Sequence, residues 1–154
     1  MIIAPHDISL KHIQQITEQL KGYQLYSEYN SSNKSKVLIL DIIGILSQLY
    51  QYARFVYIGG GFGANIHNIQ EPVTFGCPVV FGPKHTSFKE AVDLIRLGGA
   101  FSVKSQDELN HIFDRLINDE PFCQKASETC KDYLKSQLGA TDVIMRQITS
   151  TFFS

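Results

Sequence analysis

The sequence predicts an α/β fold in which a parallel sheet is flanked by helices on both faces. Short apolar runs alternate along the chain with longer stretches whose apolar residues recur at helical spacing. The short runs are apolar almost throughout, which is typical of strands buried on both faces. A length of 154 residues fits one domain covering residues 1–154.

The predicted helices are interspersed among the predicted strands up to residue 103, and three helices follow. The predicted strands are residues 2–4, 23–27, 36–40, 55–58, 78–81 and 100–103. The predicted helices are residues 8–20, 44–53, 87–97, 106–118, 121–137 and 140–148. Ser105 is expected to cap the fourth helix with Glu108 as its capping-box partner, and Gly139 is expected to separate the last two helices.

Composition and charge exclude several classes of protein. A hydrophobic content of 44% with 19% charged residues indicates a globular chain with a core, and the net charge of −1 argues against nucleic-acid binding. No apolar run approaches the ~20 residues needed to span a bilayer. The three cysteines, Cys77, Cys123 and Cys130, lack metal-binding spacing, so we expect reduced thiols, with Cys77 in the core, and no metal or cofactor.

The loops that follow the strands are where a ligand site is expected, because ligands of open α/β sheets bind beyond the carboxyl ends of the strands. The richest loop is "YIGGGFGANIHNIQEP", residues 57–72. Its glycines, including Gly60 and Gly61, allow a ligand or another chain segment to approach the backbone closely. A tight turn also accounts for them, and neither a dinucleotide fingerprint nor a phosphate-binding P-loop is present.

The end of this loop combines an amide and a carboxylate near a helix start. Asn68 can cap the helix, and the Glu71 carboxylate is suited to accept hydrogen bonds from the two hydroxyls of a ribose. A favourable interaction of Glu71 with the helix dipole is the simpler alternative.

Two other loops carry candidate groups. In "DIIGIL", Asp41 can cap the next helix, and Gly44 can expose backbone amides to a phosphate or a base edge. In "FGPKHTSFKE", Lys84 and His85 can meet a phosphate or a sugar carboxylate, although Lys84 is more simply a solvated charge. Neither a catalytic triad nor an acid/base carboxylate pair is evident. The residues therefore predict a nucleotide-recognising surface without a catalytic base.

These motifs resemble those of the 3-deoxy-D-manno-octulosonic acid (Kdo) transferases, glycosyltransferase family 30. The segment "DIIGILSQLYQYARFVYIGGGFGANIHNIQEPVTFGCPVVFGP" is similar to the family pattern D-T-x-G-E-L, F-[IV]-G-G-S, G-G-H-N-x-L-E-P and G-x-P-V-x-x-G-P. The opening "IIAPHDISLKHI" is similar to I-x-x-P-R-H-P-E-R-F. The resemblance covers about residues 1–115, and H-N-x-x-E-P is its most specific part.

The resemblance implies a two-domain GT-B glycosyltransferase on the cytoplasmic face of the inner membrane. This chain would be its C-terminal half, a Rossmann-like domain that binds CMP-Kdo. The N-terminal domain, absent here, would hold the lipid A precursor and supply the catalytic carboxylate. We therefore expect a soluble fragment that also lacks the first strand of its own domain, has no catalytic residues and does not catalyse alone.

The resemblance also implies which residues contact the donor. Pro5 and His6 fall where the family's Pro-Arg contacts CMP. The family's loop that contacts the nucleotide corresponds to Ile43, Gly44 and Ile45. Gly60 and Gly61 bring the donor close to the backbone. The ribose and phosphate contacts fall on Asn68, Ile69, Gln70 and Glu71.

Two departures from the pattern leave alternatives open. His6 replaces an arginine, which makes the cation weaker and pH-dependent, and Ile45 replaces a glutamate. The first alternative is the donor domain of another GT-B enzyme that uses a UDP-sugar or a GDP-sugar. The second is a non-catalytic module, either one that binds a nucleotide or one that kept the fold and lost the ligand, and the departures at His6 and Ile45 mildly favour it.

Overall fold

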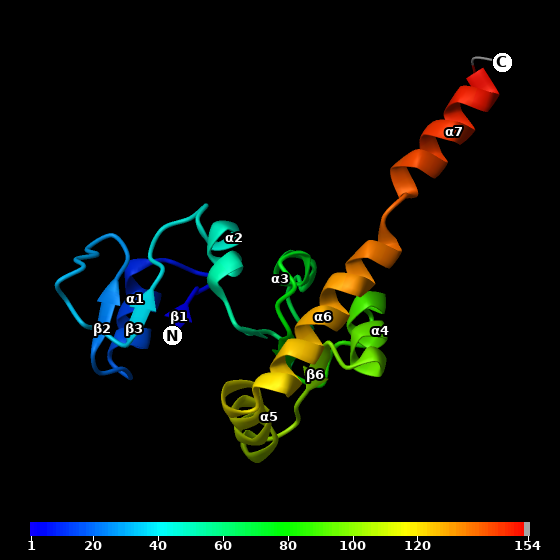
Figure 1. The fold of residues 1–154 in the computed structure, drawn as a ribbon. Helices are drawn as coiled ribbons and strands as arrows, with labels where there is room; N and C mark the ends of the chain where they lie inside the picture. The colour runs from blue at the N-terminus through cyan, green and yellow to red at the C-terminus, as the bar shows by residue number, and fades with distance from the viewer. Residues whose placement is uncertain (153–154) are drawn as a thin grey trace. The chain divides into compact units, whose positions relative to one another are not determined.

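The architecture is taken from a computed structural model that describes residues 1–152 (Figure 1). Contacts along the chain divide it into two compact units, Met1–Leu49 and Tyr50–Ser154. Each unit holds one three-stranded parallel sheet, so the predicted parallel α/β architecture is confirmed, with its strands shared between two sheets. That the two units act as one domain stays a prediction.

The first unit is built around β3 (Val37–Ile39), which pairs on one side with β1 (Ile2–Ile3) and on the other with β2 (Tyr23–Leu25). Helix α1 (Leu10–Thr17) joins β1 to β2, and α2 (Leu46–Leu49) ends the unit. Ile39 of the central strand is fully buried, and Ile13 of α1 is also buried.

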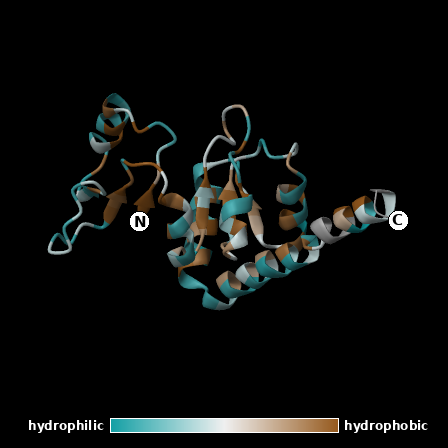
Figure 2. Ribbon diagram, turned by 90° about the horizontal axis from the view of Figure 1, so that it is seen from above, coloured by the Kyte–Doolittle hydropathy of each residue, from teal (hydrophilic) through white to brown (hydrophobic). Residues whose placement is uncertain are grey.

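The second unit repeats this plan with β5 (Val79–Phe81) between β4 (Val56–Ile58) and β6 (Ala100–Ser102). Its helices carry both polar and apolar residues, whereas hydrophobic residues are concentrated in its strands (Figure 2). The helices are η1 (Tyr50–Tyr52), α3 (Gln70–Thr74), α4 (Lys89–Leu97), α5 (Gln106–Asn118), α6 (Glu120–Gln137) and α7 (Ala140–Phe152).

Two hydrophobic clusters cover the two faces of this second sheet. Because side chains alternate along a strand, Val79 and Phe81 enter one cluster and Val80 enters the other. The first cluster is completed by residues of α3, α4 and α6, and the second by residues of α5 and the start of α6. The continuous apolar character of β5 is therefore explained by its burial on both faces.

The predicted N-cap of α5 is confirmed, but its capping-box partner bonds to a neighbouring residue. The Ser105 hydroxyl accepts the backbone N–H of Glu108 at 3.2 Å. The Glu108 carboxylate accepts the N–H of Lys104 at 2.7 Å, one residue before the position that a capping box usually uses. Gly139, with φ of +106°, separates α6 from α7 as predicted.

Three predicted helices are shorter than expected, and the one predicted at residues 87–97 begins two residues late, at Lys89. The helix predicted at residues 8–20 spans Leu10–Thr17, and beyond its end the amides of Gln19 and Leu20 donate to carbonyls three residues back. The helix predicted at 44–53 begins at Leu46, because Gly44 has φ of +98°, which is incompatible with a right-handed helix, and it ends as a 3₁₀ turn.

Cys77, Cys123 and Cys130 are buried free thiols, which confirms the core position expected for Cys77. Within residues 1–152, none of the helices has both the length and the apolar character required to cross a bilayer.

Candidate functional site

The glycine-rich loop after β4 is folded tightly against the loop after β5. A Cβ atom at Gly61 would lie 2.7 Å from the backbone nitrogen of Gly82, and one at Gly82 would lie 2.6 Å from the carbonyl carbon of Gly61. Gly60 has φ of +89°, and a Cβ there would collide with the carbonyl oxygen of Asn65. The sequence predicts that a ligand or another chain segment approaches these glycines closely. In this structure the segment that does so is the loop after β5.

Lys84 links these two loops through hydrogen bonds. Its backbone N–H donates to the carbonyl of Gly61 at 3.0 Å, and its carbonyl accepts the N–H of Ile66 at 3.1 Å. Its ammonium group also donates to the carbonyl of Gly63. Lys84 therefore holds the glycine loop through its backbone and its ammonium group, while its side chain stays exposed, as expected for a solvated charge.

The turn formed by residues 68–71 connects the glycine loop to α3. The Asn68 Oδ1 atom accepts the backbone N–H of Gln70 at 2.9 Å, and its Nδ2 lies 3.5 Å from Oε1 of Glu71. Asn68 and Glu71 are exposed, whereas Ile69 is only 1% exposed and belongs to the core. Because the Ile69 side chain is buried, only its backbone could contact a ligand.

The start of α3 offers little to an anion by itself. The helix is five residues long, so its dipole is small, and Asn68 already occupies the Gln70 amide. The chemistry of this turn therefore depends on the exposed amide of Asn68 and the exposed carboxylate of Glu71. Burial raises the pKa of Tyr50, and the negative charge of Glu71 raises it further.

The other candidate residues lie in the first unit. Pro5 and His6 follow β1, and residues 43–45 follow β3. Since β1 and β3 are paired parallel neighbours, both loops leave the same edge of that sheet. Ile43 is 84% exposed, and Gly44 has open space where a side chain would stand, so its positive φ alone accounts for the glycine.

The prediction that Asp41 caps the next helix is wrong. Helix α2 begins at Leu46, beyond reach of an N-cap at Asp41. Its carboxylate instead accepts the backbone N–H of Ser27 at 2.9 Å and the Ser27 hydroxyl. Burial raises the pKa of Asp41, but hydrogen bonds from Ser27 and from the backbone of Asp41 and Tyr26 together outweigh it, so the pKa lies below its usual range.

The structure thus gathers the candidate residues into two groups, each at the carboxyl edge of its own sheet. The group in the first unit comprises Pro5, His6, Ile43, Gly44 and Ile45, and the group in the second comprises Gly60, Gly61, Asn68, Ile69, Gln70 and Glu71. In the part of the chain that the structure describes, no cluster of three or more His, Cys, Asp or Glu side chains forms a metal site.

One residue near the turn was not among those predicted from the sequence. Glu90 of α4 accepts a hydrogen bond from the Gln70 side chain at 2.6 Å. Twenty residues separate the pair, and no motif or spacing signals the contact. Only the packing of α3 and α4 against α6 reveals it.

No family model matches the chain, but individual relatives do. It is 30% identical over 133 residues to the 3-deoxy-D-manno-octulosonic acid transferase of Chlamydia pneumoniae, a match that covers 83% of this chain and 30% of that protein. The chain is a homologue of the Kdo transferases. This homologue is also 30% identical over 114 residues to the enzyme of Aquifex aeolicus, covering 71% of the chain and 31% of the relative. It spans about a third of the length of these curated relatives.

The fold of this Kdo transferase homologue has a solved counterpart. It is similar to the C-terminal CMP-Kdo binding domain of WaaA from Acinetobacter baumannii, with a TM-score of 0.75 and 20% identity. The likeness covers 86% of this chain and 72% of that domain. At this identity the likeness establishes the shared fold.

Proposed function

We propose that this chain is the donor-binding part of a Kdo transferase and that it binds CMP-Kdo. The sequence match to Kdo transferases over most of the chain carries the proposal. The fold that it shares with a CMP-Kdo binding domain supports it. So does the turn at residues 68–71, which presents an exposed amide and carboxylate at the carboxyl end of β4.

In this proposal the chain recognises and positions the nucleotide. The Glu71 carboxylate accepts hydrogen bonds from ribose hydroxyls, and the Asn68 amide beside it contributes a donor. Holding a donor in a productive orientation can supply much of the rate of a group transfer. The longer parent enzyme would supply the catalytic carboxylate, bind the lipid A precursor and lie at the cytoplasmic face of the membrane. This part would be a soluble lobe of that enzyme.

Calorimetric titration of the chain with CMP, UDP and GDP tests the proposal. CMP is expected to bind in preference to the other two nucleotides. Glu71→Ala is expected to weaken CMP binding by about 1–3 kcal/mol, because it removes a charged hydrogen-bond acceptor. Glu128→Ala, which removes an exposed carboxylate from α6, is the matched control and should leave the affinity unchanged.

The other outcomes identify the alternatives. A preference for UDP or GDP would indicate another GT-B enzyme. A folded chain that gives no heat with any of the three nucleotides would favour a non-catalytic module. An affinity for CMP that Glu71→Ala leaves unaltered would remove this residue from the site.

A further inference from the structure

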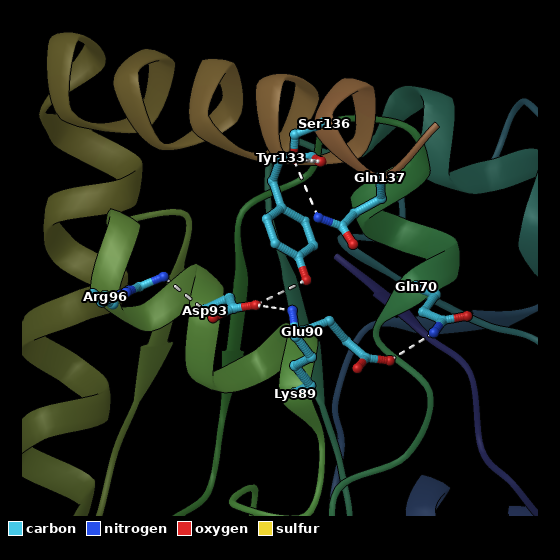
Figure 3. A network of polar contacts seen from close by, with 8 residues as sticks. All are labelled: Gln70, Lys89, Glu90, Asp93, Arg96, Tyr133, Ser136 and Gln137. Carbon is cyan, nitrogen blue, oxygen red and sulfur yellow. Dashed lines mark hydrogen bonds and ion pairs between the residues drawn. The ribbon is translucent and has the colours of Figure 1, made fainter. Parts of the chain in front are cut away.

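A short polar contact ties the first residue of α3 to α4. The Gln70 side chain points toward α4, where its Nε2 donates to Oε1 of Glu90 at 2.6 Å (Figure 3). The acceptor is a carboxylate, and charge-assisted hydrogen bonds are shorter and stronger than neutral ones. The side chain that follows the Asn68 turn is thus engaged with the protein.

The helix that holds Glu90 is itself anchored. Asp93, one turn further along α4, accepts from the Tyr133 hydroxyl of α6 at 3.4 Å, which ties α4 to α6, and from the Lys89 ammonium of its own helix at 2.6 Å (Figure 3). The hydrogen bond from Lys89 holds the pKa of Asp93 below its usual range, so this carboxylate stays ionised. Behind these contacts α3, α4 and α6 line a pocket of about 340 Å³, which Gln70 and Glu90 both border.

Gln70 therefore links the exposed turn to an anchored helix. Its backbone N–H donates to Asn68 at 2.9 Å, while its side chain donates to Glu90. Asn68 and Glu71 on either side are exposed and have no place in the hydrophobic clusters. Ile69 is buried, whereas Gln70 is exposed and is held by these two hydrogen bonds.

We infer that Gln70 is a positioning residue that acts through Glu90. It holds Asn68 and Glu71 in the orientation that receives the nucleotide, and its side chain does not itself touch the ligand. The inference rests on the proposed function, because it takes the nucleotide at this turn.

Calorimetry with CMP on single and double variants of the chain tests the inference. Gln70→Ala and Glu90→Ala should each weaken CMP binding by about fivefold, the effect of one lost hydrogen bond. The double alanine variant should bind as weakly as either single variant, since both remove the same contact. Gln124→Ala, Glu128→Ala and their combination remove a similar exposed pair from α6, bonded at 3.2 Å, and should change nothing.

A rescue experiment distinguishes a loss of positioning from a general loss of stability as the cause of weaker binding. Gln70→Glu places two carboxylates in contact and should weaken binding at least as much as the alanine change. Adding Glu90→Gln exchanges the amide and the carboxylate, so the bond can form again and affinity should return. The thermal midpoint of each variant shows whether it is folded, and Glu90→Gln alone, which keeps an acceptor, should bind nearly as the unchanged chain does.

Each remaining result would overturn the inference. If Gln70→Ala weakens binding and Glu90→Ala does not, Gln70 contacts the ligand directly. If neither change weakens binding to an otherwise competent chain, the turn needs no such support, and the proposed function still stands. If the unchanged chain does not bind CMP, the proposed function fails and the inference fails with it.

Discussion

Gly61 lies where two loops cross with no room for a side chain. The sequence alone allowed its glycine to serve a ligand, another segment or a simple turn. The nearest atoms to a Cβ at this position are the backbone nitrogen and Cα of Gly82, at 2.7 and 2.8 Å. Backbone cannot move aside as a flexible side chain can, so glycine is required here for packing.

Gly61→Ala is therefore expected to lower the free energy of unfolding of the second unit by about 1–3 kcal/mol. Gly63→Ala is the matched control in the same loop, because a Cβ there would meet only the Gly60 carbonyl at 3.4 Å. It should change stability by less than about 0.5 kcal/mol. Urea unfolding followed by circular dichroism measures both, and equal midpoints for the two variants would contradict the crossing-loop explanation.

At the scale of the element, α5 was predicted with the bounds that the structure gives it, residues 106–118. Its apolar residues recur at helical spacing and a capping signal precedes it, so local and tertiary preferences agree. The stretch at residues 44–53 has apolar spacing as well, but the positive φ of Gly44 delays its helix. Periodicity therefore predicted most of the elements, although not the short α3, whereas their ends depended on backbone conformations that spacing does not encode.

Ser105→Ala should lower the free energy of unfolding by about 1 kcal/mol, because the N–H of Glu108 loses its acceptor at the start of α5. Ser105→Asp keeps an acceptor at the same place and should be nearly neutral. Thermal unfolding followed by circular dichroism compares the two. A destabilisation of equal size in both variants would indicate that the hydroxyl acts in some way other than as a cap.

At the scale of the whole molecule, the buried thiols all lie in the second unit. Burial raises the pKa of Cys77 to about 11 and that of Cys130 to about 12. The folded unit thus keeps protons that the unfolded chain releases above its ordinary thiol pKa of 9.0. Its stability is fully present below that pH and should fall as the pH rises from about 9 toward 12.

Urea midpoints at about pH 8 and about pH 10.5 check this expectation. The double variant Cys77→Ala/Cys130→Ala should lose less stability over the same interval, since the groups responsible are gone.

In the native chain at neutral pH, a thiol reagent should react with the buried cysteines only as fast as the unit opens. Rapid labelling of a folded sample would contradict the burial on which this prediction depends.

The sequence by itself determined the parallel α/β class, the order of the elements, the core position of Cys77 and the loops in which to look for a site. These features follow from local periodicity, turn residues and motifs, all of which are written in short stretches of the chain. Only the tertiary structure decided that Gly61 meets Gly82, that Lys84 clamps the glycine loop and that Gln70 is bonded to Glu90. Those contacts join residues about twenty positions apart, and they depend on how loops and helices pack, which no local pattern specifies.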